Sequence, residues 1–246
     1  MKAMILAAGL GTRLRPLTDD RPKALVQIAG HTLLEITLRR LASFGIREVI
    51  VNVHHFADMV VDFLKSNNNF GLRIEISREE VLLDTGGGLK KASWFFLHNG
   101  SDPFLLHNVD VISTIDLARM VQFHRDHRAL ATLAVQKRET SRYLLFDDHQ
   151  LLCGRQAGKG QAAETVRAGE PVQALAFSGV HVISPRLLEQ ITEDGVFSII
   201  RTYLRLAGEK ERILAFPADP YDWRDLGKPE NVAQATDDVK RGILSL

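Results

Sequence analysis

A glycine-containing loop with several cations follows the first apolar run of the chain. Residues 6–8 lead into Gly9 and Gly11, Arg13 follows directly, and Lys23 comes later in the same segment. Glycine lets backbone N–H groups approach anionic oxygens without interference from a Cβ atom, and the two cations add charge-assisted hydrogen bonds. The loop therefore predicts a site for a phosphate chain, although a tight turn is the alternative for so short a motif.

This loop differs from two common phosphate-binding loops. The chain contains no Gly-Lys-Ser or Gly-Lys-Thr sequence, which excludes a Walker loop. Leu14 stands where the dinucleotide-binding fingerprint has its third glycine. A dinucleotide-dependent oxidoreductase is therefore a disfavoured alternative.

Three further segments carry groups that suit a nucleotide or a metal ion. The run Gly86-Gly87-Gly88 precedes a helical stretch, and consecutive glycines indicate either close backbone approach to a ligand or a flexible helix start. Asp110 ends an apolar strand, at the edge where open α/β sheets bind ligands, although a turn or capping aspartate is the alternative. Asp225 lies far along the chain, in the run Asp222–Glu230. Two carboxylates that converge in the fold suit Mg²⁺, which prefers hard oxygen ligands.

Together these segments resemble sugar-1-phosphate nucleotidyltransferases, in the family's order and over nearly the whole chain. The loop Gly-x-Gly-Thr-Arg-x-x-Pro-x-Thr with the later Pro-Lys resembles the family's signature, and the triple glycine is most similar to that of short N-acetylmuramate 1-phosphate uridylyltransferases. The resemblance implies catalytic roles for Arg13, Lys23 and Asp110, and Mg²⁺ ligation by Asp110 and Asp225. It also implies nucleotide binding by two sets of residues: Ala7, Ala8, Gly9, Gly11, Thr12, Arg13 and Lys23, and then Gly86, Gly87 and Gly88.

The sugar side of the site is less fully specified. The run Phe177-Ser178-Gly179-Val180 resembles the strand beneath the family's sugar pocket, which implies sugar contacts for Gly179 and Asn108. Glu164 is expected to accept hydrogen bonds from sugar hydroxyls. The family's Glu-Lys-Pro motif, whose lysine contacts the sugar phosphate, does not occur here. Arg155 or Lys159 could take its place, unless both are solvated surface charges.

Two positions depart from the family pattern. Val109 replaces the glycine before the first metal-binding aspartate, and Lys228 replaces the usual threonine after Gly227. Valine adds a stiff β-branched side chain near the expected ligand, while Lys228 brings an extra positive charge. These departures motivate an alternative of another class, a non-catalytic sensor that binds nucleotide sugars.

Short β-rich runs alternate with helical periodicities, which predicts an α/β fold: a three-layer, doubly wound, mostly parallel sheet of the Rossmann-like nucleotidyltransferase kind. A hairpin is expected around residues 143–153, a mobile loop at 154–169 and a closing helix at 229–244. Histidines 54, 55, 124 and 127 lack a convincing carboxylate set, and we interpret them as surface or partly packed side chains. The predicted strands are 3–8, 48–53, 72–77, 103–107, 130–136 and 176–183.

Composition sets the remaining bounds. The chain has 246 residues, 31 basic and 30 acidic side chains, and 45% hydrophobic residues. The near-neutral charge disfavours nucleic acid as a partner, and no apolar run is long enough for a signal peptide or a membrane span. With Cys153 as the single cysteine, a disulfide within the chain is impossible, which fits a reducing cytoplasm. We expect one domain, 1–246, with a nucleotide-binding half at 1–136 and a sugar-binding half at 137–246.

The sequence therefore predicts a Mg²⁺-dependent enzyme that makes a nucleotide sugar and pyrophosphate from a nucleoside triphosphate and a sugar 1-phosphate. UTP is the favoured nucleotide. Guanylyl transfer to mannose 1-phosphate and thymidylyl transfer to glucose 1-phosphate remain open, as does the sensor. The end of the chain at Leu246 leads us to expect a stand-alone transferase domain, and no feature indicates an oligomeric state.

Overall fold

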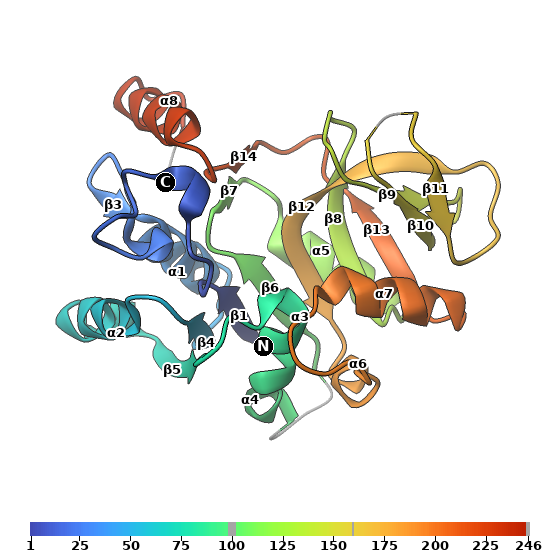
Figure 1. The fold of residues 1–246 in the computed structure, drawn as a ribbon, viewed down its shortest axis with the longest axis horizontal. Helices are drawn as coiled ribbons and strands as arrows, with labels where there is room; N and C mark the ends of the chain where they lie inside the picture. Colours follow the sequence, from blue (N-terminus) through green and yellow to red (C-terminus); the bar gives the residue numbers. More distant parts are fainter. Residues whose placement is uncertain (98–101, 159, 245–246) are drawn as a thin grey trace.

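A ten-stranded mixed sheet runs through the protein, with helices on both faces (Figure 1). The computed structural model describes residues 1–97, 102–158 and 160–244. Along the sheet the strand order is β11-β10-β9-β12-β6-β1-β4-β5, and β8 and β13 branch from β12. The α/β prediction is confirmed.

The N-terminal half supplies the parallel part of the sheet. β1 lies between β4 and β6, and β5 forms the edge. The register places Leu6 beside both Asn52 and Asn108, so three strands end at the same level. These carboxyl ends form the edge at which open α/β sheets bind ligands. The four strands are β1 (Lys2–Leu6), β4 (Glu48–Val53), β5 (Arg73–Arg78) and β6 (Phe104–Asn108).

The second half of the sheet is built around the long strand β12, which pairs antiparallel with β6, β8 and β9. Residues 154–169, which we expected to form a mobile loop, instead contain the end of β10 and all of β11. Gly154 favours a loop in the sequence, but glycine is needed here because the paired strand lies so close. A Cβ at this position would lie 2.2 Å from the carbonyl oxygen of Glu164 on β11. The strands are β8 (Ala131–Gln136), β9 (Tyr143–Phe146), β10 (Leu152–Gln156), β11 (Ala163–Thr165), β12 (Gln173–Ile183) and β13 (Ile213–Pro217).

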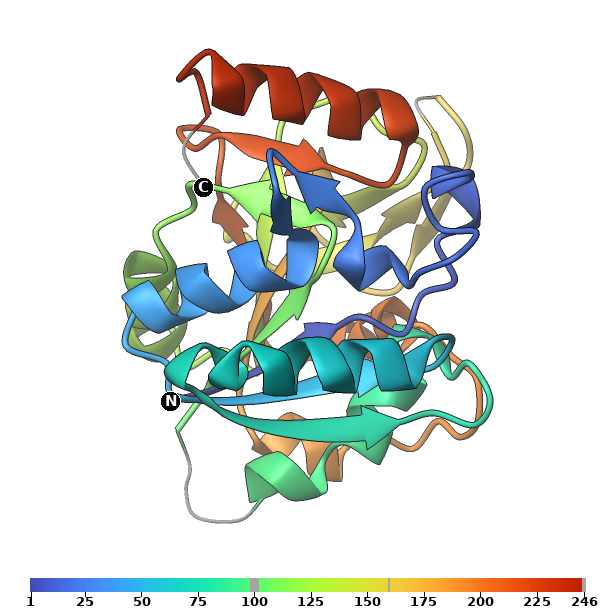
Figure 2. The same ribbon diagram turned by 90° about the vertical axis from the view of Figure 1, so that its left-hand side faces the viewer.

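Two helical layers cover the sheet and complete the predicted three-layer arrangement (Figures 1 and 2). One apolar cluster joins one sheet face to α1, α2, α5 and α8, and a second joins the other face to α3, α4, α6 and α7. The closing helix ends at Lys240 rather than at Leu244, and Gly242 follows in the left-handed conformation (φ 71°). The helices are α1 (Leu33–Ser43), α2 (Ala57–Ser66), α3 (Asp84–Lys91), α4 (Trp94–Leu97), α5 (Leu117–Asp126), α6 (Arg186–Glu189), α7 (Ile199–Gly208) and α8 (Pro229–Lys240).

Small elements shape the edge where β1, β4 and β6 end. β7 (Val111–Ser113) follows β6 and pairs antiparallel with β14 (Trp223–Asp225). A two-stranded ladder of β2 (Gln27–Ile28) and β3 (His31–Thr32) precedes α1. Within the three described ranges, no helix is long and apolar enough to cross a membrane.

Candidate active site

A cleft of about 390 Å³ opens at the carboxyl ends of β1, β4 and β6. Its walls come from the segment after β1, the end of β4, the segment from β5 to α3, and the segment after β6. Three residues that are neighbours in the sheet, Leu6, Asn52 and Asn108, form its floor. The lining is Leu6, Ala8, Gly9, Lys23, Asn52, Glu79, Leu82, Asp84, Thr85, Asn108, Val109, Asp110 and Val196.

The glycine loop takes its shape from a left-handed residue. Gly11 has φ 67°, and a Cβ there would lie 2.9 Å from Cγ2 of Thr18. The Thr18 hydroxyl donates to the Gly11 carbonyl at 2.9 Å, which ties the loop to the segment before Lys23. Among the predicted nucleotide-binding residues of this loop, the structure places Ala8, Gly9 and Lys23 in the cleft wall. Ala7, Gly11, Thr12 and Arg13 are outside that wall.

Lys23 and Asp110 meet in the cleft as an ion pair between the Lys23 ammonium and Asp110 Oδ2. Their side chains are only 13% and 17% exposed. Lys23 comes from the short turn after the glycine loop, and Asp110 comes from the end of β6. Lys23, which was predicted to contact phosphate, and Asp110, which was predicted to bind the metal ion, are therefore brought together from separate parts of the chain.

The second carboxylate, Asp225, is placed by a short antiparallel ladder. Asp225 in β14 is opposite Val111 in β7, and the Leu226 N–H donates to the Asp110 carbonyl at 2.8 Å. Asp225 Oδ1 accepts the Gly227 N–H at 2.7 Å, which orients the side chain. This contact between two distant segments is the one that the predicted metal site requires.

The donor set fits Mg²⁺. Within the described ranges, no group of three or more histidine, cysteine, aspartate or glutamate side chains is gathered in a way that could hold a metal ion. Mg²⁺ is commonly bound by one or two carboxylates, with substrate phosphates and water completing its shell. Asp110 and Asp225 are carboxylates of this kind, and their binding of a metal ion remains a prediction.

Arg13 lies beside Gly227. A Cβ on Gly227 would be 2.9 Å from Arg13 Nη2 and 2.8 Å from Asp225 Oδ1. Glycine at this position thus gives the exposed guanidinium room to lie next to the carboxylate. Arg13 and Asp225 therefore both lie next to Gly227.

The deep end of the cleft holds a buried polar network. The Ala7 N–H donates to Asn52 Oδ1 at 2.7 Å, and Asn52 Nδ2 donates to Glu79 Oε1 at 2.7 Å. Glu79, only 4% exposed, also accepts the Leu83 N–H at 2.9 Å. Neither Asn52 nor Glu79 was predicted, because no sequence spacing marks a lone amide and a lone carboxylate on adjacent strands.

The triple glycine has a packing role in this fold. Gly86, Gly87 and Gly88 lie inside α3 rather than before it, and they are buried. The N–H groups of Gly86 and Gly87 donate to the Phe197 carbonyl at 2.9 and 3.2 Å. A Cβ on Gly86 would lie 2.3 Å from the Phe197 ring. In this region Asp84 and Thr85 line the cleft, so base contacts by the glycines remain a prediction.

The predicted sugar residues are divided by the structure. Gly179 has φ 75°, and a Cβ there would lie 3.0 Å from Asn108 Nδ2, so these two residues are neighbours at the site. Glu164 is on the edge strand β11, exposed and paired with Arg155 at 2.6 Å, and neither residue is in the cleft wall. Lys159 is outside the described residues.

An unpredicted pair, Arg138 and Trp223, borders the sugar side. The Arg138 guanidinium carbon is 3.7 Å from the centroid of the Trp223 ring. Burial lowers the pKa of Arg138 below its ordinary value, and the Asp225 carboxylate opposes this shift. Arg138 lies in a stretch rich in charge and turn residues, so nothing in the sequence separates it from an ordinary surface arginine.

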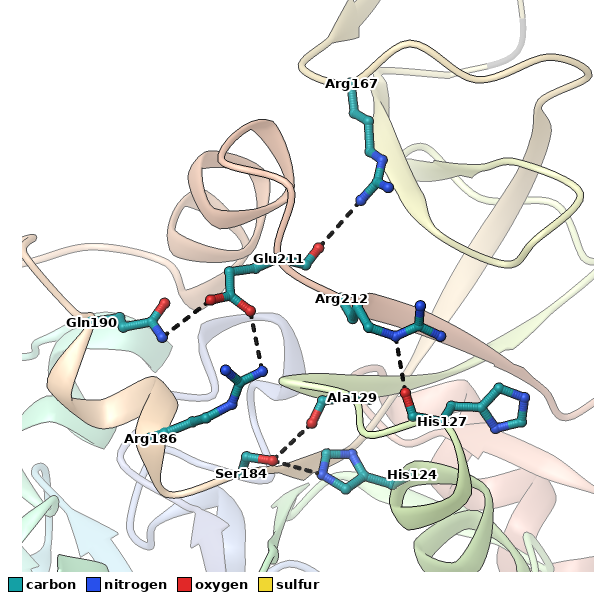
Figure 3. A network of polar contacts seen from close by, with 9 residues as sticks. All are labelled: His124, His127, Ala129, Arg167, Ser184, Arg186, Gln190, Glu211 and Arg212. Atoms are coloured by element: carbon teal, nitrogen blue, oxygen red, sulfur yellow. Dashed lines mark hydrogen bonds and ion pairs between the residues drawn. The ribbon is translucent and has the colours of Figure 1, made fainter.

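His54 is partly buried, and His55 and His127 are exposed, whereas His124 is more deeply buried than predicted. His124 is 2% exposed and lies between the Thr132 and Ser184 hydroxyls, each 3.0 Å from a ring nitrogen. Figure 3 shows Ser184 between His124 and the Ala129 carbonyl, to which its hydroxyl donates at 2.8 Å. Because the Ser184 hydroxyl donates its proton to the Ala129 carbonyl, it can only accept a hydrogen bond from His124. His124 Nε2 therefore carries the hydrogen of the neutral ring, and Nδ1 accepts a hydrogen bond from the Thr132 hydroxyl. The nearby Glu211 carboxylate binds Arg186 and Gln190 in the same region (Figure 3).

Comparisons with known proteins point to one family. A family model described as nucleotidyl transferase matches residues 2–242. N-acetylmuramate alpha-1-phosphate uridylyltransferase of Caulobacter vibrioides is 36% identical over 236 residues, which cover 93% of this chain and 92% of that protein. Probable mannose-1-phosphate guanylyltransferase 1 of Oryza sativa subsp. japonica is 31% identical over 94% of this chain, which spans 62% of that relative.

Solved structures show the same fold. HddC from Yersinia pseudotuberculosis complexed with GMP-PN matches with a TM-score of 0.74 and 23% identity, over 97% of this chain and 99% of that chain. A putative glucose-1-phosphate thymidylyltransferase from Bacillus anthracis matches with a TM-score of 0.79 and 17% identity, over 100% of this chain and 97% of that chain.

Proposed function

This chain belongs to the nucleotidyl transferase family, and we propose that it transfers a nucleotidyl group from a nucleoside triphosphate to a sugar 1-phosphate. The observation that carries the proposal is the meeting of Lys23, Asp110 and Asp225 at the carboxyl edge of the parallel strands. Cations and paired carboxylates at one edge suit a reaction between two phosphorylated substrates.

In the proposed reaction a phosphate oxygen of the sugar 1-phosphate forms a bond to the α-phosphorus. The bond from that phosphorus to the β-phosphate's bridging oxygen breaks, and pyrophosphate leaves. The attacking oxygen is already anionic, so the protein needs no general base. Catalysis then consists of positioning and charge neutralisation, as in other phosphoryl transfers.

The cations have distinct tasks in this scheme. Lys23 is half of a shielded ion pair and can exchange Asp110 for the oxygens of an arriving triphosphate. Arg13 is exposed beside Gly227, and in this proposal it stabilises the charge that develops on the leaving pyrophosphate. Asp110 and Asp225 would hold Mg²⁺, which when bound supplies further charge neutralisation to the phosphates.

We favour UTP as the nucleotide. The support is the 36% identity to a relative named as a uridylyltransferase, compared with 31% for one named as a guanylyltransferase. For the sugar we propose an amino-sugar 1-phosphate of the N-acetylmuramate type on the same ground. Asn108 and Gly179 form the sugar wall in this proposal, and Glu164 is left out because it lies on the outer hairpin.

The test is pyrophosphate release by purified protein with Mg²⁺, across UTP, dTTP, GTP, CTP and ATP combined with several sugar 1-phosphates. Release that needs one nucleotide and one sugar 1-phosphate together, with UTP and N-acetylmuramate α-1-phosphate as the expected pair, supports the proposal. A requirement for GTP and mannose 1-phosphate would keep the class and overturn the substrate. Nucleotide-sugar binding without turnover of any pair would favour a sensor instead.

A further inference from the structure

Arg138 is a half-buried cation next to the segment before Gly179, and the proposed reaction has not yet used it. It follows β8, which runs parallel to β6, so its segment leaves the sheet at the same edge as Asp110. Arg138 Nη2 donates to the Phe177 carbonyl at 2.7 Å. Its Nε is buried and has no hydrogen-bond partner within the part of the chain that the structure describes. A guanidinium with an unmet buried donor is poised for an acceptor.

The surroundings of Arg138 connect it to the sugar wall. The guanidinium stacks on Trp223, and the Trp223 indole N–H donates to the Ser178 carbonyl at 2.7 Å. Arg138 and Trp223 together therefore hold the backbone of Phe177 and Ser178, immediately before Gly179. The stacking fixes the plane of the guanidinium, which reduces the entropy lost when it binds a further anion.

The strands that lead to Arg138 and Lys23 lie on opposite sides of β6, the strand before Asp110. In the sheet, β8 is separated from β6 by β12, whereas β1, which leads to Lys23, is on the other side of β6. Lys23 pairs with Asp110, and Arg138 lies near Asp225, whose charge acts on it. An in-line displacement needs its attacking and leaving groups on opposite sides of the phosphorus.

A sugar 1-phosphate brings a charge close to −2, which requires a cation near the sugar wall. Arg155 is committed to Glu164 on the outer hairpin, and Lys23 is on the triphosphate side. We propose that Arg138 binds the phosphate of the sugar 1-phosphate and aims it at the α-phosphorus. This inference rests on the proposed function and adds the group that orients the attacking substrate.

Steady-state kinetics of Arg138→Gln test the inference, with Arg142→Gln as the matched control because Arg142 is exposed in the same segment. The KM for the sugar 1-phosphate is expected to rise by about 10- to 100-fold, the usual effect of losing a charge-assisted hydrogen bond, while the KM for the nucleotide stays within about twofold. Arg138→Lys keeps the charge and should recover part of the loss. Equal rises in both KM values, or none, would overturn the inference.

A binding measurement removes the dependence on turnover. The chain has two tryptophans, so Trp94→Phe leaves Trp223 as the only indole and a reporter of the stacked guanidinium. Titration with N-acetylmuramate α-1-phosphate should change its emission, and Arg138→Gln should weaken that response about tenfold or more. Unphosphorylated N-acetylmuramate should respond equally in both proteins.

The kinetic and binding experiments test the proposed function and the role of Arg138 separately. A wild-type protein without turnover of any substrate pair refutes the proposed function, while the titration still decides whether Arg138 binds the phosphate. If Arg138→Gln does not fold, Arg138→Lys serves in both assays, with the same selective loss expected at a smaller size. An Arg138→Lys protein with wild-type KM and wild-type titration would then overturn the inference.

Discussion

Acid is expected to destabilise the fold through His124, because this ring is held neutral between two hydroxyl groups. Burial lowers the pKa of His124 from 6.5 to about 4, and Arg125 and Arg186 add smaller effects in the same direction. Because the folded-state pKa is depressed, the unfolded chain takes up the proton first as the pH falls. The stability that depends on neutral His124 is therefore complete above a pH of about 6.5 and is lost between about 6.5 and 4.

The size of the effect follows from the two pKa values. At a pH of about 5, His124 is almost fully protonated in the unfolded chain and mostly neutral in the folded protein. The free energy of unfolding is therefore lower by roughly 2 kcal/mol than at a pH of about 7.5. Urea unfolding of wild type and His124→Gln at both pH values measures it. We expect the wild-type free energy of unfolding to fall by roughly 2 kcal/mol more than that of the variant.

His127→Gln is the matched control, because His127 is exposed on the same helical segment. Its pH dependence should equal that of the wild type. If His124→Gln showed the full wild-type loss of stability on acidification, the assignment of a buried neutral imidazole would be refuted. A large change in the pH dependence of His127→Gln would also contradict the reasoning.

Four substitutions near the cleft have separable expected outcomes. Gly86→Ala should lower the free energy of unfolding by about 1–3 kcal/mol through its clash with the Phe197 ring, and an unchanged urea midpoint would contradict the packing role. Gly227→Ala should displace Arg13 and lower kcat by about tenfold or more, whereas a wild-type kcat would remove Arg13 from the transition state. Asp225→Asn should raise the Mg²⁺ concentration needed for half-maximal rate, and an identical Mg²⁺ titration would exclude it as a ligand. Glu79→Ala leaves the Leu83 N–H and the Asn52 amide without their acceptor; we expect a raised nucleotide KM and a stability loss of about 1–3 kcal/mol, and a wild-type result in both assays would show that the network is dispensable.

Local signals in the sequence predict much of the fold because they report local physics. Thr32 with Glu35 three residues later predicts a helix start, and the Thr32 side chain does accept the Glu35 N–H. Gly45 after the same helix is left-handed, as a C-cap requires. The strand that precedes Asp110, β6 (Phe104–Asn108), is equally visible from its apolar run.

Features that depend on contact between distant segments were not predicted. The triple glycine indicates close approach, but no local pattern shows that Phe197 is one of the groups that approach it. The β7–β14 ladder that joins Asp110 to Asp225 consists of two strands too short to show a period. The unmet donor of Arg138 is likewise a property of the folded chain alone.

The most direct test of the central claim is the stoichiometry of products when UTP and N-acetylmuramate α-1-phosphate are incubated with the protein and Mg²⁺. Mass spectrometry of the nucleotide sugar, together with a pyrophosphate assay, separates transfer from simple hydrolysis. We expect one nucleotide sugar for each pyrophosphate released, and near-complete loss of both in Asp110→Asn. Pyrophosphate without nucleotide sugar, or full turnover by Asp110→Asn, would contradict it.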